Sequence, residues 1–213
     1  MWDYLVERRA LVGYQALQHL SLVVQCVVLG GLLAVALAVL VYRSPRATAA
    51  ANAFSAVGLT IPSFALLGLL LAPFGFGVTP AVIAVTFYAA LPVLRNAVVG
   101  LAGVDRALVE SARGIGMSRG RTLLRVELPL AWPVILAGVR TSTQMVMGIA
   151  AIAAYVLGPG LGGFIFTGLS RLGGANALNA TLTGTFVIVV LALVVDLLLV
   201  GVGRLTTPRG IRA

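Results

Sequence analysis

LSLVVQCVVLGGLLAVALAVLVY, residues 20–42, is an apolar run of 23 residues without a charged side chain. A helix needs about 20 predominantly apolar residues to cross the hydrocarbon core of a bilayer. A secretory signal has an apolar core of only about 7–15 residues before its cleavage site. This run continues past its one small-residue candidate site, Ala34-Val35-Ala36. We therefore interpret the segment as a membrane helix that the protein retains.

Four further segments have a similar apolar character and length. They cover residues 52–72, 78–101, 131–157 and 181–203. Pro62 interrupts the first of the four, and a proline inside a helix removes a backbone hydrogen bond and kinks the chain. The pattern predicts an all-α integral membrane protein with five transmembrane helices, organised as a single domain over residues 1–213.

Two segments outside these spans have a mixed character. Residues 2–18 combine Trp2, Tyr4 and several aliphatic side chains with charges, which is typical of a short helix lying in the membrane interface. Residues 158–179 are rich in glycine and are too short and too polar to span. We expect this second segment to form an outer loop or a short re-entrant helix packed against protein.

The composition excludes several classes of function. Hydrophobic residues make up 60% of the chain and charged residues only 10%, and the mean hydropathy is +1.08. A soluble domain is about one quarter charged. The net charge of +9 comes from 15 arginines that are scattered between apolar runs, so we do not expect a nucleic-acid partner. A lone Cys26 and a lone His19 argue against a disulfide, a metal site and a membrane-embedded enzyme.

The arginines predict the orientation of the chain, because cytoplasmic loops of membrane proteins are enriched in Lys and Arg. With the N-terminus outside, the outer face holds Arg8, Arg9 and Arg171, and the inner face holds ten arginines. These ten are Arg43, Arg46, Arg106, Arg113, Arg119, Arg121, Arg125, Arg204, Arg209 and Arg212. The excess favours an N-terminus outside the cell and a cytoplasmic C-terminus, with membrane lipid around the spans.

The one long cytoplasmic loop, residues 103–130, has the signals of two short helices. Asp105 can cap a helix that runs to about Ile115, and Gly116 can end it by taking a positive φ. Ser118 can cap a second helix, which we expect to end before Pro129. The first helix should present Leu108, Val109 and Ala112 on one face. Such a pair would form a rigid knob on the inner side of the membrane.

The same loop resembles the EAA loop of permease subunits of ATP-binding-cassette (ABC) importers. Glu110-Ser111-Ala112 is followed after three residues by Gly116 and after nine more by Val126-Glu127-Leu128-Pro129. The family pattern is E-A-A, three residues, G, nine residues and I-x-L-P, so only Ser111 and Val126 depart from it. The resemblance implies the fold of a type I ABC importer permease.

A wider resemblance points to a subfamily. Residues 60–67 (TIPSFALL), 91–96 (LPVLRN), 138–143 (GVRTST) and 160–166 (GLGGFIF) are similar to permeases for osmoprotectants such as glycine betaine, carnitine and choline. The main alternative is a permease for amino acids such as methionine, which shares the loop and the five-helix plan. An ion-driven secondary transporter is a further alternative, although no inverted repeat is detectable.

The resemblance also implies the partners in a bacterial cytoplasmic membrane. The chain lacks a phosphate-binding Gly-Lys-Ser/Thr loop and has no lysine, so ATP should be bound by a separate ATPase and no cofactor by this chain. A second permease, identical or paralogous, should complete the pathway, and an extracytoplasmic binding protein should deliver the solute to residues 158–179. The residues expected to couple to the ATPase are Glu110, Ser111, Ala112, Arg113, Gly116, Arg119, Arg121, Leu128 and Pro129.

Polar residues inside the spans are candidates for the pathway. They are Thr60, Pro62, Ser63, Tyr88, Thr141 and Gln144. A kink, interhelical hydrogen bonds or packing would explain the same residues without transport. For the two intramembrane charges we expect Arg140 to extend toward the inner surface rather than to act as a gate or as a charge at an interface. We expect Asp196 to be a structural partner of an arginine rather than part of a proton route.

Overall fold

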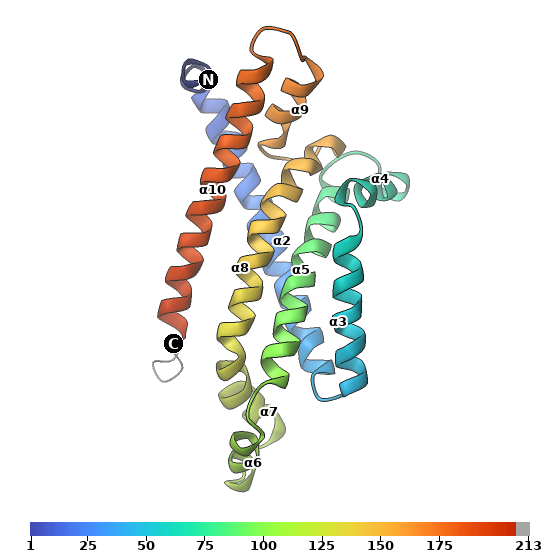
Figure 1. Cartoon of the computed structure of the whole chain (residues 1–213), viewed down its shortest axis with the longest axis vertical. Coiled ribbons are helices and arrows are strands. Elements are labelled where there is room, and N and C mark those ends of the chain that lie inside the picture. The colour runs from blue at the N-terminus through green and yellow to red at the C-terminus, as the bar shows by residue number, and fades with distance from the viewer. Residues whose placement is uncertain (208–213) are drawn as a thin grey trace.

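The computed structural model describes residues 1–207, and these form a bundle of helices (Figure 1). The long helices run roughly side by side along one axis of the molecule. One end carries α6 (Arg106–Gly114) and α7 (Arg119–Thr122), and we call it the knob end. The other end, called the loop end, carries α1 (Trp2–Glu7), α4 (Ser63–Phe74) and α9 (Gly162–Ser170).

The first membrane helix is longer than its apolar run. α2 covers Arg9–Val41, 33 residues or about 50 Å, so it exceeds the roughly 30 Å hydrocarbon core of a bilayer. The prediction of an interfacial helix over residues 2–18 is therefore wrong in its extent, because only α1 is separate from the membrane helix α2. Residues 9–18 contain no proline, and the chain breaks only at Arg8 (φ −104°, ψ 16°) before it continues as α2.

The second span differs most from the prediction. Ser44 accepts a hydrogen bond from the Ala47 amide and Pro45 opens the helix, so α3 covers Pro45–Thr60 and begins before residue 52. Ile61 and Pro62 are extended, because a residue that precedes proline is disfavoured in the helical region. α4 then leaves at 92° to α3 and crosses the loop end of the bundle (Figure 1). Residues 52–72 are thus a bent pair of helices instead of one continuous helix.

The remaining spans are close to their predicted positions. They are α5 (Val78–Ala102), α8 (Leu128–Ile152) and α10 (Ala177–Thr206). With α2 they are four helices long and apolar enough to cross a membrane, and the bent pair α3–α4 brings the number to five within the described residues. The predicted short helix in residues 158–179 is present as α9, which packs against α10.

The sequence predicted that the second helix of the knob ends before Pro129, and this prediction is wrong. α7 continues through a π-helical turn, Leu123–Glu127, directly into α8. The ring of a proline in a helix clashes with the carbonyl four residues earlier, which for Pro129 is that of Arg125. Because Arg125 lies in the wider π turn, we attribute the passage of the helix through Pro129 to that turn. The knob is consequently a rigid extension of α8.

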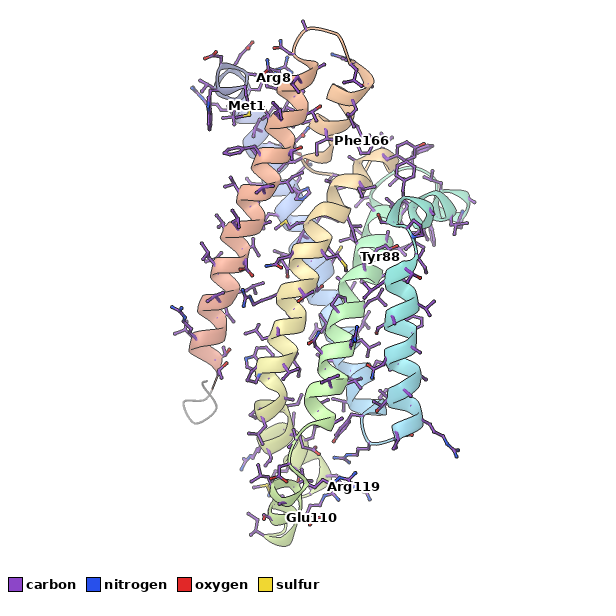
Figure 2. The ribbon with its side chains drawn as sticks, in the orientation of Figure 1. Met1, Arg8, Tyr88, Glu110, Arg119 and Phe166 are labelled. Atoms are coloured by element: carbon purple, nitrogen blue, oxygen red, sulfur yellow. The ribbon has the colours of Figure 1, made fainter. Side chains whose placement is uncertain are left out.

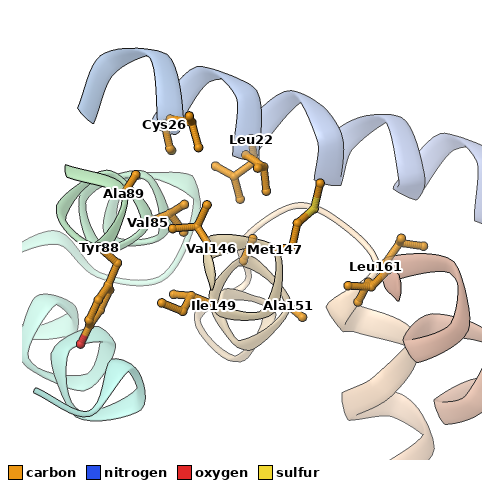
Figure 3. Close-up of a cluster of buried hydrophobic side chains, with 14 of the residues drawn as sticks. Leu22, Cys26, Val85, Tyr88, Ala89, Val146, Met147, Ile149, Ala151 and Leu161 are labelled. Carbon is orange, nitrogen blue, oxygen red and sulfur yellow. The ribbon is translucent and has the colours of Figure 1, made fainter. Parts of the chain in front are cut away.

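The core lies where α2, α5 and α8 meet, and Figure 3 shows its centre. Val85 and Ala89 of α5 and Val146 and Met147 of α8 are fully buried there, beside Leu22 and Cys26 of α2. Small residues let the helices approach closely. A methyl group on Gly30 of α2 would lie 2.8 Å from the carbonyl oxygen of Thr86, and one on Gly138 of α8 would lie 2.7 Å from Cβ of Asn96.

We predict that Gly30→Ala destabilises the protein and that Gly31→Ala does not. At Gly30 the new methyl group would force α2 and α5 apart, which should cost about 1–3 kcal/mol. The neighbouring Gly31 has no atom within 4 Å of an added Cβ, so alanine there should stabilise the helix by about 0.5–1 kcal/mol. Thermal unfolding in detergent micelles measures both variants. Equal effects of the two substitutions would contradict this account of the α2–α5 contact.

Candidate coupling and pathway sites

The knob is built by local hydrogen bonds that the sequence signals predicted. The Asp105 carboxylate accepts from the Ala107 amide at 2.9 Å, and the Ser118 hydroxyl accepts from the Arg121 amide at 3.4 Å. α6 ends in a Schellman motif, in which Gly116 has φ +88° and donates its amide to the Arg113 carbonyl at 2.9 Å. The Met117 amide completes the motif by donating to the carbonyl of Ala112 at 3.0 Å.

Most of the predicted coupling residues lie on the surface of this knob. Figure 2 shows Glu110 and Arg119 at one extreme of the molecule and Met1 and Arg8 near the other. The exposed members are Glu110, Ser111, Arg113, Gly116, Arg119 and Arg121. Ala112 is buried, and Leu128 and Pro129 are partly buried at the base, where the knob joins α8. The predicted set thus divides into a charged tip and a structural base.

The apolar face predicted for α6 is divided in a similar way. Ala112 is buried and Val109 is partly buried, so these two side chains stabilise the knob itself. Leu108 is 48% exposed, and Ile115, at the end of α6, is 78% exposed. Exposed aliphatic side chains among charged ones are common at surfaces that bind another protein. A partner surface at the knob would therefore meet Leu108 and Ile115 together with the exposed arginines of the knob.

Glu127 connects the base of the knob to the first membrane helix, and sequence reasoning did not assign it this role. Its carboxylate accepts a hydrogen bond of 2.7 Å from the Tyr42 hydroxyl and pairs with the Arg43 guanidinium at 3.1 Å. Only 3% of Glu127 is exposed. Burial, with the hydrogen bond to Glu127 and its charge, raises the pKa of Tyr42 to about 12. Tyr42 therefore keeps its proton and remains a donor at neutral pH.

A cavity of about 450 Å³ lies beside this contact, between the knob and the ends of α2, α3 and α5. Its lining includes Tyr42, Arg43, Thr48, Arg113 and Glu127. The family pattern leaves position 127 free, so the motif carries no signal for its role.

At the corner between α3 and α4, Tyr88 is buried and hydrogen-bonded to the backbone. Tyr88 is 2% exposed, and its hydroxyl donates to the carbonyl of Ile61 at 2.5 Å. This bond satisfies a carbonyl that the break before Pro62 leaves without a helical partner. Pro62 and Thr60 are exposed, Ser63 is partly buried, and Thr60 bonds to the Val57 carbonyl at 2.7 Å. The role of Thr60, Pro62 and Ser63 in a pathway stays a prediction.

Arg140 and Asp196 form an ion pair between α8 and α10. Nε of Arg140 lies 3.0 Å from Oδ1 of Asp196 and Nη2 lies 3.0 Å from Oδ2, which is a bidentate geometry. The prediction that Arg140 extends toward the inner surface is wrong, whereas an arginine partner for Asp196 is confirmed. Gln144 donates to the same carboxylate at 3.0 Å, and Thr141 is exposed beside it.

His19 is buried, with Nε2 3.1 Å from the Met147 carbonyl oxygen, so it links α2 to α8. The described residues contain no group of three or more His, Cys, Asp or Glu side chains that could hold a metal ion.

The described residues form a bundle of candidate membrane spans with a capped two-helix knob at one end. The family model of the binding-protein-dependent transport system inner membrane component matches residues 27–207. This chain belongs to that family, and it is a multi-pass component of the inner membrane with a role in transport.

Individual relatives agree with this membership. The glycine betaine/carnitine/choline transport system permease protein OpuCB of Bacillus subtilis is 37% identical over 199 residues, covering 93% of this chain and 90% of that protein. The osmoprotectant import permease protein OsmW of Salmonella typhimurium is 37% identical over 214 residues, covering 98% of each. Among solved structures, an inward-facing MetNI methionine ABC transporter has a TM-score of 0.78 at 20% identity, covering 95% of this chain and 99% of that one. It shows that the fold is that of a type I ABC importer permease.

We predict that Gly116→Ala loosens the knob without unfolding the bundle. No atom lies within 4 Å of an added Cβ, so the only cost comes from the positive φ, about 1–2 kcal/mol. Hydrogen exchange measured by mass spectrometry should become faster in residues 106–118 and remain unchanged in α5. Gly120→Ala is the matched control, because Gly120 lies in α7 with open space around it and without a positive φ. The prediction fails if both variants exchange like the wild type.

Proposed function

We propose that this chain is the permease subunit of an ATP-driven importer for osmoprotectants of the quaternary ammonium class. The observation that carries the proposal is the exposed two-helix knob with its E-S-A-x3-G pattern, fixed rigidly to α8. Relatives at 37% identity over nearly the whole chain are permeases for glycine betaine, carnitine and choline or for osmoprotectants, which supports the substrate class. The likeness to a methionine transporter, at 20% identity, extends only to the fold.

The knob couples the permease to a separate ATPase subunit, which binds the ATP. Glu110, Arg113, Arg119 and Arg121 offer charges for a polar rim, and Leu108 and its neighbours enter the cleft of the ATPase. Because α7 is continuous with α8, a displacement of the knob is carried into the membrane as a movement of a whole helix. The Glu127 contact transmits the same displacement to the end of α2.

Two further partners complete the importer. A second permease, identical or paralogous, pairs with this chain to enclose the pathway. An extracytoplasmic binding protein docks at the loop end, where α4, α9 and the glycine-rich turns lie. In this proposal the loop end faces the outside of the cell and the knob end faces the cytoplasm.

The arginines support this orientation. Near the knob end the described chain carries eight of them, and near the loop end it carries Arg8, Arg9 and Arg171. The eight are Arg43, Arg46, Arg106, Arg113, Arg119, Arg121, Arg125 and Arg204. The remaining two of the predicted inner set, Arg209 and Arg212, lie outside the described residues. α1 and the last turn of α10 lie at opposite ends of the bundle, as five crossings require.

The proposal predicts uptake of glycine betaine by proteoliposomes that contain this permease, its ATPase and its binding protein. Uptake should require ATP on the side of the membrane that carries the ATPase. Unlabelled carnitine or choline should compete with glycine betaine, and methionine should not. Competition by methionine alone would identify the amino-acid alternative. In the same vesicles Gly116→Ala should reduce uptake while the amount of inserted permease stays constant, and Gly120→Ala should not reduce it.

The orientation predicts the labelling of single introduced cysteines. In right-side-out vesicles a membrane-impermeant maleimide should label Ser170→Cys at the loop end at once. Ser111→Cys, in the knob, should react only after the membrane is permeabilised. The native Cys26 is 1% exposed and serves as the background control. The reverse pattern of labelling would place the knob outside and exclude coupling to a cytoplasmic ATPase.

A further inference from the structure

The Arg140–Asp196 pair occupies an unusual position for a structural ion pair. Arg140 is the central residue of α8, about 18 Å from either end of that helix, so it lies well inside the span. Charged side chains at this depth are rare and face the interior of a bundle or a water-filled space. A pair that served only to hold two helices together would be expected to lie between them, covered on all sides.

This pair is instead open to one side of the subunit. The side chain of Arg140 is 40% exposed and that of Asp196 is 21% exposed. Thr141 and Gln144 are exposed on the same helix, whereas the opposite side of α8 is buried against α5 and α2. Because lipid cannot solvate a charge pair, the open face has to meet the second permease or the water between the two subunits.

α10 does not depend on the ion pair for its attachment. Near the loop end it packs against α9, where Gly184 lies against Phe164 and Ile165. At the knob end the Trp132 indole N–H donates to the Thr206 hydroxyl at 2.7 Å. The pair therefore lies between two attachments that can hold α10 while the pair itself opens.

We propose that Arg140 and Asp196 are a substrate contact in the pathway, a charge pair that opens to receive a zwitterion bearing a carboxylate and a quaternary ammonium. This assignment rests on the proposed function. The carboxylate of the zwitterion takes the place of Asp196 on the guanidinium fork of Arg140, and the quaternary ammonium lies against the released carboxylate of Asp196.

The exchange is balanced in charge, which is why a zwitterion suits it. Both charges of the pair and both charges of the ligand have an opposite partner before and after the exchange, so none is left unpaired in a medium of low dielectric constant. A simple cation would neutralise Asp196 and leave Arg140 without a partner. At this contact a zwitterion such as glycine betaine or carnitine is therefore favoured over a simple cation such as choline, which can compete for uptake but leaves Arg140 unpaired.

Gln144 has a positioning role in this arrangement. Its amide nitrogen donates to Oδ1 of Asp196 at 3.0 Å, independently of the two bonds from Arg140. When the guanidinium turns to the ligand, this bond keeps the carboxylate directed toward the open face. Gln144 thus fixes the place at which the ammonium is received.

The test uses the complete importer in proteoliposomes, with the pair neutralised as Arg140→Gln together with Asp196→Asn. The two amides can still bond across α8 and α10, so the helices stay linked without charge. We expect glycine betaine uptake to fall at least tenfold while ATP hydrolysis stimulated by the loaded binding protein persists. Uptake within twofold of the wild type, or loss of uptake and stimulated hydrolysis together, would overturn the proposal in favour of a structural pair.

A charge-reversed variant, Arg140→Asp with Asp196→Arg, supplies the second measurement and decides the matter if the neutral variant fails to assemble. This variant retains an ion pair between the helices. If the role of the pair is purely structural, the variant should therefore take up glycine betaine like the wild type. We expect uptake to remain low, because Gln144 then faces an arginine and the carboxylate is displaced onto α8. Uptake by the wild type in the same experiment tests the proposed function separately, since only its absence there would refute the substrate class.

Discussion

The absence of hydrogen-bonding partners in the hydrocarbon core is the constraint on which the rest of this structure depends. A backbone carbonyl freed inside a membrane has to be bonded by the protein itself. The corner between α3 and α4 meets this demand through Tyr88, whose hydroxyl bonds the carbonyl of Ile61. Ser142 of α8 similarly donates to the Ala89 carbonyl of α5 at 2.7 Å. The Tyr88 bond supplies a partner at the point where the second span turns through 92°, and the Ser142 bond links α8 to α5.

Close packing complements these polar links. Gly30 brings α2 against α5, and Gly138 brings α8 against the same helix, so three spans share one core (Figure 3). In a membrane the helices gain no hydrophobic free energy from excluding lipid, and small residues at the crossings are what allows close van der Waals contact. A rigid central triplet follows, and α8 belongs to it. The knob, being a continuation of α8, is therefore attached to the most tightly packed part of the molecule.

The same physics separates two kinds of charge in this chain. Arginines at the helix ends are solvated and favour one orientation of the chain in the membrane. Those on the knob also offer a surface for a partner. Glu127 and the Arg140–Asp196 pair lie where solvation is poor, and each is paired or hydrogen-bonded. The two arginines are equally exposed, 41% for Arg43 and 40% for Arg140, but the carboxylate of Glu127 is 4% exposed and that of Asp196 is 21% exposed. The exposure of the carboxylate, together with its place inside the span, is why we treat the first pair as structural and the second as a contact for a ligand.

The sequence by itself determined the class, the spans and the caps of the knob. Four of the five apolar runs correspond to single long helices, and Asp105, Gly116 and Ser118 act over a few neighbouring residues, so local rules read these features correctly. Pro62 indicated a kink, but the 92° turn after Thr60, the helix through Pro129 and the partners of Glu127 and Arg140 were seen only in the tertiary structure. Each of these depends on groups more than fifty residues apart or on how a helix accommodates a proline. Composition can indicate that a charge needs a partner, but only the packing of the helices brings that partner within 3 Å or so of it.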